Sequence, residues 1–176
     1  MRAIIEESWL KQPVWYKLYK TALVRDILFP KGKYHEDVFW SYQAVGRAQR
    51  VSVSDHIGYY YLQRDGSIMG EGYSLKRLDA VEAKVQRCAY IQERFPALSP
   101  LAVKDIWFTC IYHGQLAMRT LDISAAKEIV AYLKGVLRVH SFSSETCSIK
   151  ERIWLDMARN GLATTCRVRN MLKIGL

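Results

Sequence analysis

The sequence predicts an α/β protein in which a small sheet lies within the first 73 residues and a mostly α-helical extension follows. Two observations indicate this fold class. Before residue 64, β-branched and aromatic residues gather in two short runs that are typical of strands. From Ser74 onward, apolar residues recur with the 3.6-residue period of amphipathic helices. We therefore expect two domains, 1–73 and 74–176.

The first domain mixes short elements. Residues 15–24 and 37–47 have helical patterns, and the proline and glycine of 29–33 (FPKGK) predict a loop between them. In 51–53 valines alternate with a serine as in a strand, and 58–63 (GYYYLQ) predicts a second strand. The segment RDGS that follows is typical of a turn.

The second domain is predicted to be helical. A first helix covers 74–95, with Ser74 as its cap and a proline directly after it. Further helices are expected at 101–118, 124–139 and 148–160, the last ending at an Asn-Gly pair. A basic amphipathic segment, 165–174, closes the chain.

Charge and hydropathy limit the expected partners and cellular location of the protein. The chain has 26 Lys and Arg against 17 Asp and Glu, a net charge of +9, which favours an acidic partner. No apolar run approaches the ~20 residues needed to cross a bilayer, and the N-terminus lacks the pattern of a signal peptide. The four cysteines have no CxxC spacing, as in reduced intracellular proteins. We expect a cytoplasmic protein, free or peripheral on the inner face of the membrane.

Several motifs of known chemistry are absent. The sequence has no phosphate-binding GxxxxGK[ST] loop, no HExxH, no GxSxG and no GxGxxG. It also has no DxD pair to hold a divalent metal on a diphosphate, and its four histidines lack ligand spacing. The sequence therefore predicts no metal ligands.

The strongest chemical signal is the adjacent pair of carboxylates Glu36 and Asp37, which follows a glycine-bearing loop and opens a predicted helix. The positive end of the helix dipole keeps a carboxylate ionised there, where a substrate can reach it. A hydroxyl that attacks a sugar's anomeric carbon needs such a base. The alternative is that Asp37 only caps the helix.

Four segments in order resemble the second half of bacterial family 2 glycosyltransferases, which build capsule, exopolysaccharide and O-antigen chains. The resemblance covers residues 13–83, and where the family usually has Asn before Lys-Leu-Tyr this chain has Tyr16. The four segments are WYKLYK (15–20), FPKGKYHED (29–37), GYYYLQRDGSIM (58–69) and SLKRLDAVEA (74–83).

The resemblance implies the C-terminal part of a GT-A-like domain that performs inverting transfer of a sugar from a nucleotide-sugar to a glycan or lipid-linked acceptor. It implies Asp37 as the base and Glu36 as a residue that positions acceptor hydroxyls. Arg64 would face the diphosphate, and the other implied substrate contacts are Ser67, Lys17 and Tyr61. Mg²⁺ or Mn²⁺ would be bound mainly by the family's first half. That half has no counterpart here, so we expect a truncated enzyme that is inactive alone.

Each of these assignments has a structural alternative. Tyr59, Tyr60 and Tyr61 would either stack on a sugar or face the core, and Arg64 would otherwise be a solvated turn residue. The basic C-terminal segment would contact anionic lipid or simply be solvated. The competing function is a non-catalytic basic helical module that binds nucleic acid, membrane or a partner protein, although no nucleic-acid-binding motif is present. An open sheet edge would also favour self-association.

Overall fold

The computed structural model describes residues 1–60, 62 and 73–175. Contacts within the chain divide it into two compact units, Met1–Gly72 and Tyr73–Leu176. In the following text these are called unit 1 and unit 2.

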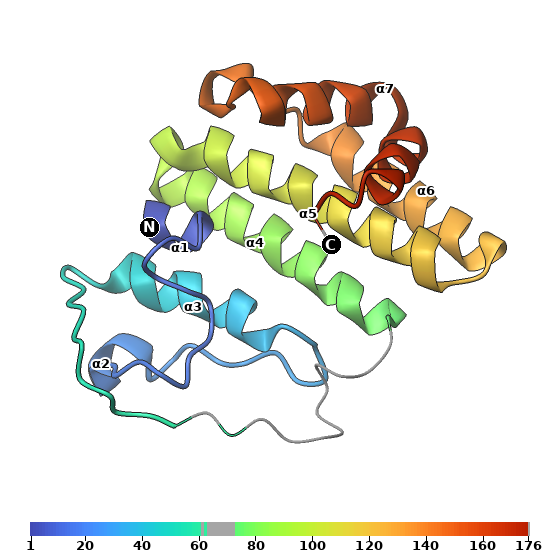
Figure 1. The fold of residues 1–176 in the computed structure, drawn as a ribbon. Coiled ribbons are helices and arrows are strands. Elements are labelled where there is room, and N and C mark those ends of the chain that lie inside the picture. The colour runs from blue at the N-terminus through green and yellow to red at the C-terminus, as the bar shows by residue number, and fades with distance from the viewer. Residues whose placement is uncertain (61, 63–72, 176) are drawn as a thin grey trace. The chain divides into compact units, whose positions relative to one another are not determined.

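Unit 1 contains the helices α1 (Arg2–Ile5), α2 (Thr21–Val24) and α3 (Glu36–Arg47), joined by loops (Figure 1). Its core forms where α3 meets the loop that precedes it. Trp40 and Ala44, one turn apart on α3, are buried against Ile27. The Trp40 indole N–H donates to the Ile27 carbonyl at 2.9 Å, so the ring's polar atom is satisfied inside the core.

Only part of the predicted helix 15–24 is present, because α2 is confined to Thr21–Val24. Upstream, the Lys17 N–H donates to the Val14 carbonyl at 3.3 Å and closes a single turn. The predicted helix 37–47 corresponds to α3, which begins one residue earlier.

Unit 2 is a group of helices in which α5 lies centrally and contacts α4, α6 and α7 (Figure 1). The long helices correspond to the four that the apolar period predicts. Their bounds are α4 (Asp79–Arg94), α5 (Ser99–Thr120), α6 (Ile123–Val139) and α7 (Ile149–Met171), with short 3-10 turns η2 (Leu75–Leu78), η3 (Pro96–Leu98) and η4 (Ser144–Thr146).

Polar groups fix two of the helix starts. The Asp122 carboxylate accepts the backbone N–H groups of Ser124 and Ala125, both at 2.9 Å, and so caps α6. Ser148 and Glu151 form a capping box at the start of α7. The prediction placed the start of this helix after Ser124. In the structure α6 begins two residues earlier, because the cap is Asp122.

A glycine lets α5 and α7 approach closely. A Cβ atom added at Gly114 would lie 2.8 Å from the Cys166 sulfur, so a side chain there would require the Cys166 side chain or α7 itself to shift. The Cys166 thiol in turn donates to the Ile111 carbonyl of α5 at 3.5 Å.

α7 bends at Gly161, whose backbone is extended rather than helical (φ −169°, ψ 88°). The Asn-Gly pair was predicted to end the helix. Instead the chain resumes its helical course, because Leu162, Thr165 and Cys166 remain buried beyond the bend. The predicted segment 165–174 thus largely belongs to the second half of α7.

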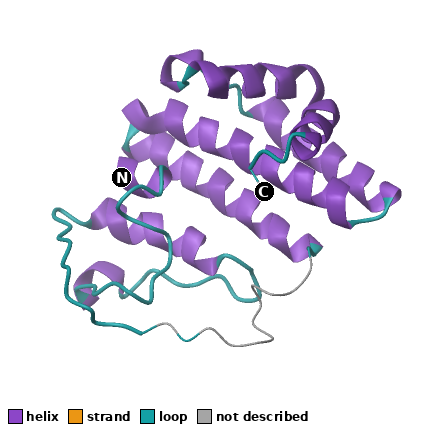
Figure 2. Ribbon diagram, in the orientation of Figure 1, coloured by secondary structure: helices purple, strands orange, loops and turns teal. Residues whose placement is uncertain are grey.

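The predicted small sheet is wrong for the part of the chain that the structure describes. Residues 1–60, 62 and 73–175 contain helices and loops without a strand (Figure 2). Residues 51–60 are exposed, and among the described residues no backbone hydrogen bond pairs them with another segment. Strand propensity expresses packing on a pleated surface, and without a partner it has no effect. The GT-A-like α/β fold class is therefore corrected to an all-helical one, and the expected sheet edge disappears with it.

Across the ranges described, no helix is both long and apolar enough to cross a membrane.

Candidate functional site

The two candidate carboxylates lie in the first turn of α3. The helix begins at Glu36, directly after His35, whose backbone is left-handed (φ 57°, ψ 36°). The Glu36 side chain is exposed, whereas Asp37 is half-buried. Because His35 occupies the capping position, Asp37 lies inside the helix rather than at its cap. Both carboxylates face the positive end of the helix dipole.

The pKa of Asp37 is raised above its ordinary value. Burial is the main cause, and the neighbouring negative charge of Glu36 adds to it. The Val38 backbone N–H and the charge of His35 oppose the rise but do not cancel it. The raised pKa makes the Asp37 carboxylate a stronger base than an ordinary aspartate, which is a property that a general base requires.

Lys17 lies within electrostatic range of Asp37. Burial lowers the pKa of Lys17 to about 8, while Asp37 acts to raise it. The ammonium donates to the carbonyl of Lys11 at 2.7 Å and to that of Pro13, and it lies 4.1 Å from the centre of the Tyr16 ring. Because an ammonium has three N–H donors, these two bonds leave one for a ligand.

Tyr19 adds a polar group without a partner. Its hydroxyl is buried and makes no hydrogen bond to the described residues. Burial raises the pKa of Tyr19 to about 12, with smaller contributions from Tyr16 and Asp37. The ring packs edge-on against Trp40, with centroids 4.9 Å apart, so the core of unit 1 fixes the position of the hydroxyl.

Gln12 and Ser41 connect the segment that carries Lys17 to α3. The buried Gln12 side chain donates to the Ile4 carbonyl at 2.8 Å. The Ser41 hydroxyl donates to the Gln12 carbonyl at 2.6 Å. These bonds join α1, the loop after it and α3, and thereby position Lys17 relative to the start of α3.

Of the six predicted site residues, the structure brings Glu36, Asp37 and Lys17 together. Tyr61, Arg64 and Ser67 lie outside the described residues, so their roles stay predictions. The neighbouring Tyr59 lies 4.8 Å, centre to centre, from Trp15, which brings segment 48–60 to the WYKLYK segment.

Sequence reasoning missed two contributors to this site. Tyr19 lies in the WYKLYK segment, and that position was a signal that could have identified it. Gln12 had no such signal, because its importance depends on a hydrogen bond to a residue 29 positions away.

The divalent metal implied by the family resemblance has no set of ligands in the described residues. Within 1–60, 62 and 73–175, no group of three or more His, Cys, Asp or Glu side chains could hold a metal ion. No step proposed below uses a metal. Comparison of the chain with protein-family models, with curated proteins and with solved structures finds no match.

Proposed function

We propose that unit 1 supplies the acceptor side of an inverting sugar transferase, with Asp37 as the base that takes the proton of the attacking hydroxyl. The observation that carries the proposal is the state of Asp37, which is half-buried in the first turn of α3 and has a raised pKa. A carboxylate with a raised pKa is a stronger base than an ordinary exposed aspartate.

The surrounding groups suit a polyhydroxylated acceptor. The Tyr19 hydroxyl lacks a partner among the described residues, and the Lys17 ammonium retains one N–H. An acceptor hydroxyl can reach the Lys17 ammonium directly, whereas the buried Tyr19 hydroxyl would be reached only after a local rearrangement of unit 1. The exposed Glu36 carboxylate can accept a hydrogen bond from a further acceptor hydroxyl and so orient the acceptor beside Asp37.

We assign binding of the donor nucleotide-sugar to residues outside this sequence. The sequence has no DxD pair, so we propose that this chain alone binds no nucleotide-sugar and transfers no sugar. Calorimetry with UDP- and GDP-sugars in the presence of Mn²⁺ is expected to show no binding. A micromolar dissociation constant would contradict this division of roles.

Acceptor binding is tested by titrating alkyl glycosides of the common hexoses into the isotope-labelled chain and following its amide signals by NMR. We expect the amides of Lys17, Tyr19 and Val38 to shift. The shifts should be lost in Asp37→Asn and kept in the matched control Asp55→Asn, since Asp55 is exposed. Equal shifts in both variants, or shifts confined to unit 2, would overturn the proposal.

A further inference from the structure

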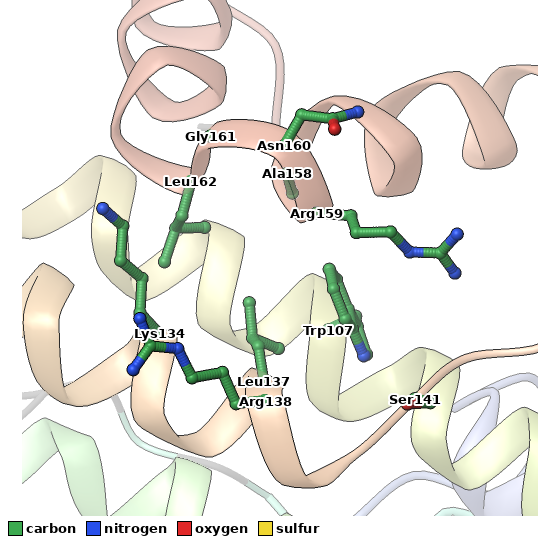
Figure 3. Close-up of a pocket in the computed structure, with 10 residues that line it drawn as sticks. All are labelled: Trp107, Lys134, Leu137, Arg138, Ser141, Ala158, Arg159, Asn160, Gly161 and Leu162. Atoms are coloured by element: carbon green, nitrogen blue, oxygen red, sulfur yellow. The ribbon is translucent and has the colours of Figure 1, made fainter.

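Unit 2 contains a cavity of about 400 Å³ that is bounded by α5, α6 and α7. Buried apolar side chains from all three helices form its floor: Trp107, Leu137 and Leu162. Three exposed cations also line it, Lys134, Arg138 and Arg159. In Figure 3 Lys134 and Arg138 lie to one side and Arg159 to the other, with the apolar floor between them (Figure 3).

The floor of this pocket presents an apolar surface, because the indole N–H of Trp107 is already hydrogen-bonded within the protein. The Trp107 indole N–H donates to the His140 carbonyl at 2.6 Å. The bend of α7 at Gly161 lies at the same pocket and separates Arg159 from Leu162. Arg159 can therefore stand at the rim while Leu162 joins the floor.

The protein balances the positive charge of the pocket only in part, through the ion pair of Arg159 with Asp156 and the contact of its guanidinium with the Phe142 ring, 4.2 Å from the ring centre. No Asp or Glu lines it. Lys134 and Arg138 form no ion pair among the described residues, and they lie one turn apart on α6, a spacing at which like charges repel. Asp156, the carboxylate nearest to Arg159 at 3.7 Å, is shared with Arg152 at 3.6 Å.

Three other cations of unit 2, which are buried or half-buried, form close ion pairs. Lys84, Arg87 and Lys104 each lie within 2.9 Å of a carboxylate oxygen. Exposed cations elsewhere in unit 2, such as Lys127 and Arg167, also lack an ion pair among the described residues, so the pocket is distinguished by the apolar floor beside its cations. A site that holds cations without acids, beside an apolar floor, has the chemistry of an anion-binding site whose anion is attached to an apolar body.

We propose that this pocket binds a phosphate group, with Lys134, Arg138 and Arg159 contacting the phosphate oxygens and the floor contacting the body that carries it. Guanidinium groups match phosphate oxygens in a bidentate manner, and a phosphate monoester carries ~1.5 to 2 negative charges near neutral pH. The phosphate can belong to a small soluble molecule or to a lipid head group.

The test uses two probes, inorganic pyrophosphate by calorimetry and vesicles of phosphatidylcholine with or without phosphatidic acid by co-sedimentation. The pocket variant is Lys134→Gln/Arg138→Gln, whose side chains are exposed and have no ion pairs to lose. The control is Lys127→Gln/Arg167→Gln, which removes the same charge from exposed positions of α6 and α7 outside the pocket.

We expect binding to weaken at least ~10-fold in the pocket variant and less than ~2-fold in the control. Pyrophosphate binding with this dependence identifies a soluble ligand, and binding to phosphatidic acid vesicles alone identifies a lipid head group. Equal weakening in both variants would reveal only a general basic surface and overturn the proposal. Failure of the unaltered chain to bind either probe would overturn it as well. Neither result depends on Asp37, so the acceptor proposal is tested separately.

Discussion

Asp37 shows, at the scale of a residue, what a sequence can and cannot predict. Its place in the first turn of a helix was predicted correctly, because Gly32 and the acidic pair are local signals. Its half-burial and its nearness to Lys17 were not predictable. Both depend on how the loop of residues 11–17 folds back toward α3, and no local pattern encodes that contact.

The raised pKa of Asp37 makes a prediction about stability. Its unfolded-state pKa is ~3.9, and the native value is higher, so in the interval between them the native state binds more protons than the unfolded state. The stability of the native chain therefore falls as pH rises through this interval. Because asparagine does not ionise, Asp37→Asn removes this pH-dependent fall in stability. We expect the variant to gain stability relative to the native chain as pH rises from 4 to 7, measured by urea unfolding.

Asp55→Asn is the matched control, since Asp55 is exposed and should show no such gain. If Asp37→Asn instead became relatively less stable as pH rises, the Asp37 charge would be stabilising the helix. A purely structural role, in which the Asp37 charge interacts with the helix dipole, would then replace that of a base.

At the scale of elements, the helices of unit 2 were predicted from the sequence, whereas the predicted strands of unit 1 are absent from the described residues. Apolar residues at helical spacing suffice to indicate a helix, because its backbone bonds are internal to the segment. A strand needs a partner that its own sequence does not reveal. The valines and tyrosines of 51–60 satisfy strand propensity, yet among the described residues they have no partner.

The interface between α4 and α5 depends on one carboxylate. Asp105 of α5 accepts from Arg87 at 2.5 Å and from Lys84 at 2.9 Å, both on α4. Arg87 is 1 % exposed, so removing the Asp105 charge weakens the compensation of a buried charge. Asp105→Asn should cost ~3 kcal/mol of unfolding free energy in urea titrations.

The control for this interface is Asp156→Asn, because Asp156 pairs with Arg152 and Arg159 only at 3.6 and 3.7 Å on the surface. Its cost should stay below ~1 kcal/mol. Similar losses in the two variants would mean that Asp105 does not hold α4 to α5.

At the scale of the whole molecule, the two units differ in how much core they possess. The buried apolar residues described in unit 1 lie on two of its short helices, α1 and α3, and at Leu10 and Ile27 between them. Unit 2 buries apolar residues on all four of its long helices. A chain segment of ~60 residues buries only ~60 % of its surface and is marginally stable. The units are therefore expected to differ in autonomy.

We expect residues 73–176, expressed alone, to be helical by circular dichroism and to unfold in one cooperative thermal transition. Residues 1–72 alone should show a broad transition or none. A segment 73–176 that lacks helical signal would show that unit 2 needs unit 1 to fold.

The central position of α5 has a consequence for folding kinetics. Its contacts with α4 and α6 join helices that are consecutive in the chain, so each forms by closing a short loop. The contact between α5 and α7 closes a longer loop, because α6 lies between these two helices in the chain. It also depends on the tight approach at Gly114. Docking of α7 is then a late event, and truncating its buried side chains should chiefly accelerate unfolding while leaving the folding rate almost unchanged.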